Sequence, residues 1–391
     1  MRIFVLGLPH TITSPDFSSC AYTMKAWNLC RMMSDLGHEV VHFGNEGSHP
    51  PGAEHVTLLP RAEWAAVHCH PGKDFFDISV DSPERKAFHG RFAEVLRERM
   101  NERLADGEKT IVCITWGGAQ RQAIHGLTGR AIVVESGIGY RHSWANYRVF
   151  ESYAWLHMTL GAEDIFSGEK WYWPVIPNAF DPAMFTYNDA KEDYFLYLGR
   201  IIRSKGVSLA VDLAKRTGRR IILAGQGDPA PYMDSHVEYI GPVGVERRRD
   251  LLANASALIC PTFYVEPFGG VNVEAQMSGT PVITTDYGAF TETVQHGVTG
   301  YRCRTMEQFE FAARHIDCIR PADCRRWAMN YSLERVGLMY DEYFRMLLDL
   351  YGDGFYAEHP ERAQLNWLSK DFPCSPLTSI EDNVHQWSQA N

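Results

Sequence analysis

The sequence predicts an α/β protein with two doubly wound, Rossmann-like domains, each a parallel sheet covered by helices on both faces. The first observation is the length of 391 residues, which is more than one hydrophobic core usually serves. The second is an alternation of short apolar runs with amphipathic segments of helical spacing, which is typical of parallel sheets. The third is that this alternation restarts after residues 171–185, a stretch with three prolines that we expect to link the domains.

The first domain, residues 1–180, begins with a strand, a helix and a second strand. The apolar run 2–6 ends at Gly7 and reads better as a buried strand than as a signal peptide, because no small-residue cleavage site follows it. Apolar residues at helical spacing then continue until Gly37 ends the pattern. The elements expected in this domain are strands at 2–6, 39–43, 110–115 and 131–135 and helices at 22–36 and 92–104.

The second domain, residues 187–335, repeats the alternation of strands and helices. Its strands are short apolar runs, and several of them are followed directly by glycine-containing loops. An amphipathic helix at 336–351 and a tail of weak periodicity follow this domain. The elements expected within it are strands at 194–198, 220–224, 237–240, 257–261 and 281–284 and helices at 207–215, 245–252 and 270–277.

Composition excludes several classes of protein. Apolar residues make up 45% of the chain and charged residues 22%, as in ordinary globular proteins and unlike disordered chains. The net charge of −10 argues against nucleic-acid binding. No run of about 18 apolar residues predicts a transmembrane helix, although peripheral membrane contact stays open. The nine cysteines are scattered singly, which does not indicate a disulfide framework and suits a reducing, cytoplasmic compartment.

One loop gathers cations at the end of a predicted strand. After strand 194–198 the chain reads Gly199 to Gly206, with Arg200, Arg203 and Lys205 between the two glycines. Ligands of open α/β sheets bind outside the carboxyl ends of the strands. A guanidinium can hold phosphate oxygens in a bidentate manner, and glycines permit close backbone approach. The loop is therefore a candidate diphosphate site, and alone it would equally be an ordinary solvated basic loop.

A second loop carries two glutamates with seven residues between them. Glu266 and Glu274 flank a Gly269–Gly270 pair that we expect to open a helix. Glu266 would then precede the first turn, and Glu274 would lie about one turn inside the helix. The unbonded amides of such a helix start can receive a phosphate or a developing negative charge. The simpler interpretation of Glu274 is an exposed helical glutamate.

These loops belong to a set of motifs that resembles the retaining GT-B glycosyltransferases of family 4, the glycosyl transferases group 1. The resemblance extends over most of residues 1–350, and its motifs are in register across the donor domain of that family. The motifs are LGRIIRSKG, ILAGQGD, IGPV, EPFGGVNVEAQMSGTPVI and GVTGY, together with VIPNAFDPAMF in the linker and LGHEVVHFG in the first domain.

The resemblance implies a GT-B fold, in which residues 1–180 bind the acceptor and residues 187–335 bind a nucleotide-sugar donor. Residues 336–391 would cross back onto the first domain. Arg200 and Lys205 would hold the diphosphate, Glu274 the ribose hydroxyls, and Glu266 would face the transferred sugar. The nucleotide base would lie against backbone near 241–243. The implied donor-binding residues are Gly199, Arg200, Lys205, Gly225, Gly227, Val243, Glu266, Phe268, Gly269, Gly270, Val271 and Glu274, although Gly225 and Gly227 could equally be sharp turns.

The first domain departs from the family pattern, which leaves the acceptor side open. Cys20 and Ala21 stand where the family commonly has a glycine pair, and residues 135–137 (Glu-Ser-Gly) stand where a histidine is common after the strand equivalent to 131–134. Candidates for the missing role are His10, Asp16, Glu135 and His142. His10 follows the first strand and should line the crevice, whereas His142 could orient substrate or pack at the interface.

The implied activity is retaining, hexosyltransferase-type transfer in carbohydrate biosynthesis, without a metal or another cofactor. His68, Cys69 and His70 form a dense group, but two histidines two residues apart on a strand do not make a zinc site. The acceptor would be a carbohydrate, a lipid-linked molecule or a small molecule. Two alternatives stay open, namely a GT-B sugar-nucleotide epimerase or hydrolase and a non-catalytic nucleotide-sugar binding protein. A dehydrogenase is disfavoured because no Gly-x-Gly-x-x-Gly fingerprint opens the first helix.

Overall fold

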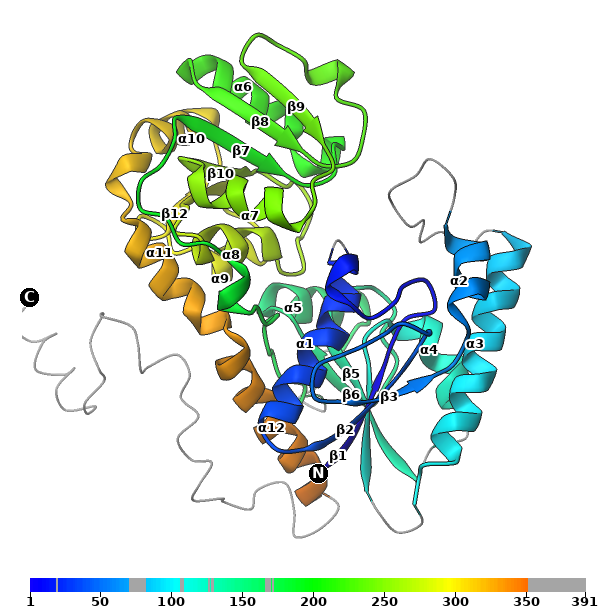
Figure 1. The fold of residues 1–391 in the computed structure, drawn as a ribbon. Helices are drawn as coiled ribbons and strands as arrows, with labels where there is room; N and C mark the ends of the chain where they lie inside the picture. Colours follow the sequence, from blue (N-terminus) through cyan, green and yellow to red (C-terminus); the bar gives the residue numbers. More distant parts are fainter. Residues whose placement is uncertain are drawn as a thin grey trace, which may run out of the picture.

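A computed structural model describes residues 1–18, 20–69, 82–105, 109–125, 127, 130–165, 170 and 172–350. This part of the chain forms two domains, each built on a six-stranded sheet with helices packed on it (Figure 1). The sheet orders are β3-β2-β1-β4-β5-β6 and β12-β11-β10-β7-β8-β9, which is the same order of 3-2-1-4-5-6 within each domain. The neighbouring strands are parallel in both sheets, so the prediction of two doubly wound domains is confirmed.

The first domain wraps two apolar layers around its sheet. The side of the sheet that includes Ile3 and Val5 packs against α1, and the side that includes Phe4 and Leu6 packs against α3. Strand alternation therefore sends successive residues of β1 into different layers. The elements are β1 (Arg2–Leu6), α1 (Ala21–Asp35), β2 (Glu39–Gly44), β3 (Glu54–Thr57), α2 (Arg61–His68), α3 (Pro83–Asn101), β4 (Thr110–Ile114), α4 (Gly117–Ile124), β5 (Ala131–Ile138), β6 (Tyr147–Phe150) and α5 (Tyr153–Ala162).

The second domain repeats this construction. The strand β7 (Tyr194–Leu198) lies in the middle of its sheet and is almost wholly buried, which explains its continuous apolar run. The other elements are α6 (Val207–Thr217), β8 (Arg220–Ala224), β9 (Val237–Gly241), α7 (Val245–Asn254), β10 (Ala257–Cys260), α8 (Gly270–Met277), β11 (Val282–Thr285), α9 (Phe290–Thr293), β12 (Gly300–Cys303), α10 (Met306–Arg314) and α11 (Pro321–Ala328).

The helix α12 (Leu333–Leu350) joins the end of the second domain to the first (Figure 1). Val336, Tyr340 and Phe344 are buried in the same apolar cluster as Ile3 and Ala26. None of the helices in the described ranges is both long and apolar enough to cross a membrane.

The chain passes between the domains twice, in the linker and again at the start of α12, and these two segments lie side by side. Phe180 of the linker donates its amide to Tyr331 O at 2.8 Å and accepts from the amide of Leu333 at 3.0 Å. The linker and the start of α12 are therefore joined by backbone hydrogen bonds where they pass between the domains.

Candidate functional site

The cationic loop lies at the carboxyl end of β7. Its first residues run beside the loop after β8, because the Gly199 amide donates to Ala224 O at 2.9 Å and the Ile201 amide donates to Gln226 O at 2.7 Å. Arg200 and Arg203 are exposed, whereas Lys205 is half-buried before α6. The loop thus offers exposed guanidinium groups beside a lysine that is already held in place.

Lys205 is held by the loop that follows β10. Its Nζ donates to Glu266 Oε2 at 2.6 Å and lies 4.9 Å from the centre of the Tyr264 ring. Burial alone would lower the pKa of Lys205, but the Glu266 carboxylate, together with Cys260 and Tyr264, outweighs burial and raises this pKa above its usual range. The predicted phosphate-binding lysine and the predicted sugar-facing glutamate are therefore one ion pair, with side chains 21% and 13% exposed.

The helix α8 begins at the glycine pair, as predicted. It starts at Gly270, after Gly269 in a left-handed conformation with φ of 76°. A Cβ on Gly269 would lie 2.5 Å from the Phe290 ring, so the position requires glycine for both reasons. Val271 is half-buried against the core. Phe268 is 3% exposed and stacks on Phe180, which leaves only its backbone to meet a donor.

Glu274 forms an ion pair with Arg248, a residue that the sequence pattern did not indicate. Arg248 of α7 donates from Nε to Glu274 Oε2 at 2.8 Å and makes a second contact through its terminal nitrogen. The Glu274 side chain is 15% exposed, so the interpretation as a merely exposed glutamate is wrong. Arg248 lies within a run of three arginines, and nothing in that run distinguishes it from its neighbours.

Gly225 and Gly227 serve the packing of two loops. A Cβ on Gly225 would lie 1.9 Å from Gly199 O, and one on Gly227 would lie 2.6 Å from Ile201 O. These glycines let the loops after β7 and β8 touch through their backbones. The predicted base-binding stretch is next to them, because the Gly225 amide donates to Gly241 O at 2.9 Å. Val243 is half-buried beyond β9.

Glu135 in the first domain is engaged by the protein itself. Its carboxylate is fully buried and accepts from the amides of Trp144 and Ala145, each at 2.7 Å, and from the Tyr140 hydroxyl at 3.0 Å. Burial raises the pKa of Glu135, and these donors oppose the rise. The buried carboxylate therefore holds the loop after β5 in place.

The histidine candidates differ in exposure. His10 is 1% exposed, and its ring packs edge-to-face against that of Trp116, with 4.6 Å between the ring centroids. The expectation that His10 lines an open crevice is therefore wrong. Burial, helped by His89 and His68, lowers the pKa of His10 to about 3. His142 is exposed and has a φ of 63°, which is unusual for a residue with a side chain. Asp16 is also exposed.

Among the described residues, no group of three or more histidine, cysteine, aspartate or glutamate side chains could hold a metal ion. His68 is the last residue of α2, so the expectation that it lies on a strand is wrong. Its ring stacks between those of Trp64 and His89. His70 lies outside the described residues.

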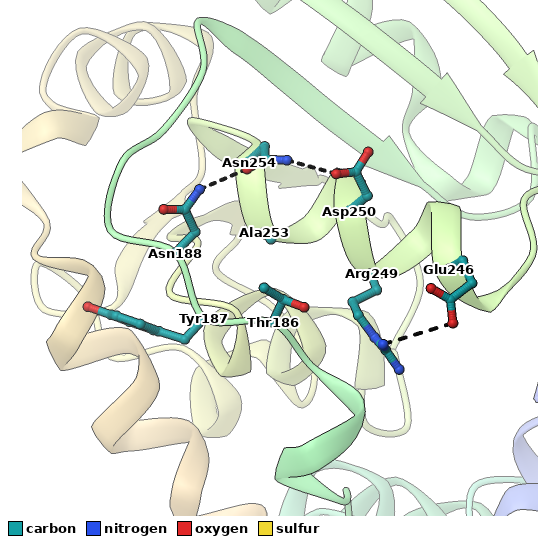
Figure 2. A pocket seen from close by; sticks show the side chains of 8 residues that line it. All are labelled: Thr186, Tyr187, Asn188, Glu246, Arg249, Asp250, Ala253 and Asn254. Atoms are coloured by element: carbon teal, nitrogen blue, oxygen red, sulfur yellow. Dashed lines mark hydrogen bonds and ion pairs between the residues drawn. The ribbon is translucent and has the colours of Figure 1, made fainter.

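A pocket of about 400 Å³ lies at a different place in the second domain. Its lining combines residues 186–188, which directly follow the linker, with one face of α7 (Figure 2). Asn188 Nδ2 donates to Asn254 Oδ1 at 2.8 Å, which closes one end of the pocket just before β10 begins. The pocket therefore lies near the amino end of β10, whereas Lys205 and Glu266 lie at the carboxyl end of the sheet. This pocket is not the predicted donor site. The pocket is lined by Thr186, Tyr187, Asn188, Glu246, Arg249, Asp250, Ala253 and Asn254.

The second domain matches a known family. Residues 185–326 match the family model described as glycosyl transferases group 1. An uncharacterized glycosyltransferase of Methanocaldococcus jannaschii is 29% identical over 122 residues, which are 28% of this chain and 31% of that protein. A glycogen synthase of Mycobacterium tuberculosis is 30% identical over 157 residues, 36% of this chain and 38% of that protein. The chain thus spans about a third of the length of the curated relatives it matches.

Solved structures extend the likeness to both domains. The sucrose-phosphate synthase of Thermosynechococcus elongatus superposes with a TM-score of 0.65 at 16% identity, covering 89% of this chain and 99% of that one. At that identity the match concerns the fold, and the expected GT-B architecture is confirmed.

Proposed function

Because residues 185–326 of this chain match the glycosyl transferases group 1 family model, we propose that the protein is a glycosyltransferase. It moves a hexose from a nucleoside-diphosphate-sugar donor to an acceptor hydroxyl, with retention of the anomeric configuration and without a metal ion. The single observation that carries this proposal is the ion pair of Lys205 and Glu266, at the carboxyl ends of β7 and β10, with Arg200 in the same loop as Lys205.

The proposed chemistry follows from where negative charge develops. In the transfer, the bond from the anomeric carbon to the diphosphate oxygen breaks, and the acceptor oxygen bonds to that carbon. The leaving nucleoside diphosphate gains negative charge and takes the hydroxyl proton. Fixed cations and helix N-termini stabilise such charge. Arg200, Lys205 and the start of α8 supply these groups, which supports transfer without a metal ion.

Glu266 is suited to contact the sugar. Its hydrogen bond with Lys205 holds the carboxylate next to the place where the diphosphate would lie. A carboxylate there can accept hydrogen bonds from sugar hydroxyls and stabilise positive charge that develops at the anomeric carbon. Glu274, held by Arg248, is suited to accept from the ribose hydroxyls. Retention is supported by the resemblance of the segment that joins these glutamates to the retaining family.

The first experiment is a thermal-shift panel of UDP, GDP, ADP, TDP and CMP with their common sugar conjugates. A ligand that binds only the folded state raises the melting temperature. We expect one nucleoside diphosphate and its sugar conjugate to raise it, and Arg200→Ala to abolish the rise. Arg216→Ala is the matched control, because Arg216 is an exposed arginine paired with Asp212 on α6.

The same panel supplies the donor for turnover assays. An acceptor screen with that donor, with the anomeric configuration of the product read by NMR, tests transfer and retention together. Breakdown or epimerisation of the donor without an acceptor would identify an epimerase or a hydrolase instead. Donor binding without any product would identify a binding protein. The absence of any shift would contradict donor binding itself.

A further inference from the structure

The segment between β6 and α5 connects the first domain to the loop that carries Glu266. Glu151 at its start is 5% exposed in its side chain and forms an ion pair with Lys25 of α1. It also accepts from Asn178 of the linker at 3.0 Å. The next three residues reach the second domain. This segment is therefore fixed on the side of the first domain before it meets the donor half.

Ser152 makes the central contact. It is 1% exposed, and its hydroxyl donates to Pro267 O at 2.6 Å. The same oxygen accepts from the Trp155 amide at 3.1 Å, which caps the N-terminus of α5. A serine hydroxyl has one proton and can accept at the same time, so both contacts are satisfied together. Pro267 directly follows Glu266, so the bond fixes the peptide next to the proposed sugar-facing carboxylate.

Glu292 makes a second contact beside it. Its two carboxylate oxygens accept from the amides of Tyr153 and Ala154, each at 2.9 Å, at the start of α5. Glu292 lies in α9, and the residue before that helix, Ala289, donates its amide to Glu266 O at 3.2 Å. The backbone of Glu266 is thus joined to α9, and α9 is joined to the first domain.

Apolar packing closes the same junction. Val265, one residue before Glu266, packs against the buried cluster of the first domain that contains Ile138, Phe150 and Trp155. The residues before and after Glu266 are therefore both in contact with the first domain. By itself, the capped start of α5 would be an ordinary helix terminus. Here the contacts of the first domain reach Val265 and Pro267, the residues on either side of Glu266. The junction can therefore affect the position of the proposed sugar-facing carboxylate.

We propose that Ser152, supported by Glu292, is a positioning residue that fixes Glu266 for transfer by tying its loop to the first domain. This inference rests on the proposed function. The position of the Glu266 carboxylate in the second domain then depends on contact with the first domain, so it is correct for transfer only when the two domains are in contact. A misplacement of about 1 Å at such a group can cost about 100-fold in rate.

The test compares Ser152→Asn with Ser152→Asp. Asparagine and aspartate have the same shape and are equally good N-caps. Only asparagine has an N–H to donate to Pro267 O, whereas the aspartate carboxylate repels it. Both variants replace a buried serine by a larger side chain, so effects of size cancel in the comparison. The matched control is the same pair of changes at Ser82, which caps α3 through Arg85 N at 3.2 Å within the first domain.

The first readout is hydrogen–deuterium exchange of the ligand-free protein. We expect Ser152→Asp to speed exchange at least fivefold over Ser152→Asn in peptides covering 153–156 and 263–269, and the Ser82 pair to show no difference there. Glu292→Gln, which changes the other side of the junction, should speed exchange in the same peptides. Equal exchange in the two Ser152 variants would overturn the proposal.

The second readout uses whichever of UDP, GDP, ADP or TDP raises the melting temperature, together with its sugar conjugate. We expect kcat of Ser152→Asp to fall at least tenfold below that of Ser152→Asn, while the Kd for the free nucleotide stays within twofold. Equal kcat values would overturn the positioning role. If no donor binds or turns over, the proposed function fails, and the exchange comparison still decides whether Ser152 fixes the loop.

Discussion

Lys205 Nζ and Glu266 Oε2 lie 2.6 Å apart, although the two residues are 61 positions apart in the sequence. They meet because β7 and β10 are neighbours in the second sheet, and parallel neighbours bring the loops at their carboxyl ends together. Each residue sets the charge environment of the other, so neither can be changed alone without affecting the partner.

Lys205→Met should reduce sugar transfer by about 100- to 1000-fold, which is the usual cost of losing one stabilising group at a developing negative charge. Lys205→Arg keeps the charge and should retain more of the rate. Steady-state kinetics with the donor found by thermal shift would measure both. A Lys205→Met enzyme as fast as Lys205→Arg would contradict a role for the charge.

Glu274→Gln and Glu266→Gln should have separable effects. Glu274→Gln should weaken binding of the free nucleotide about tenfold, because it removes the proposed charged acceptor for the ribose hydroxyls. Glu266→Gln should leave nucleotide binding nearly intact and reduce transfer. Titration calorimetry with the free nucleotide and rate measurements separate the two. Equal losses of nucleotide affinity would refute this division of roles.

Gly225→Ala should destabilise the second domain by about 3 kcal/mol, because its φ of 148° and the carbonyl of Gly199 leave no place for a Cβ. Gly199→Ala is the matched variant, since a Cβ on Gly199 would meet no atom within 4 Å. It should fold with normal stability and lose affinity for the donor only if the donor approaches that backbone closely. Urea unfolding and nucleotide titration of both proteins would check this pair.

His42→Gln should make the stability of the first domain less sensitive to acid. Burial, and then the neighbouring His55, lower the pKa of His42 from 6.5 to about 3. Below pH 6.5 the unfolded chain gains a proton at this residue and the folded chain does not, so the free energy of unfolding falls as the pH falls towards 3. One such group contributes about 1.4 kcal/mol per pH unit.

Urea unfolding at pH 7.5, 6 and 5 would measure this dependence. The slope of the free energy of unfolding against pH should be smaller in His42→Gln than in the unchanged protein. His157→Gln is the control, because His157 is exposed on α5. Identical slopes in the unchanged protein and His42→Gln would show that the burial of His42 does not contribute.

The central strands and the edge strand β9 could be predicted from the sequence, and the other three edge strands could not. Strands β1, β7 and β8 have the predicted bounds, because buried central strands are continuous apolar runs. The prediction missed β3, β6 and β12, which lie at sheet edges and are only four residues long. Short edge strands carry polar residues, so their pattern does not differ from that of loops.

The donor-side residues could be chosen from their spacing and the acceptor-side residues could not. Glu266 and Lys205 each follow a strand that the sequence reveals, so their meeting could be expected. Arg248, Ser152 and Glu292 are single polar residues in unremarkable contexts, and their contacts depend on tertiary packing. His10 also follows a predicted strand, but no pattern in the sequence indicates that Trp116 would cover it.

The return of α12 to the first domain determines the order in which the protein can be completed. Val336, Tyr340, Phe344 and Leu347 are buried in the core that the opening residues Ile3 and Val5 also enter. During synthesis the first half emerges long before these residues exist, and domains generally fold in the order of synthesis. The core of the first domain is therefore complete only after the second domain has been synthesised, because α12 follows that domain in the chain.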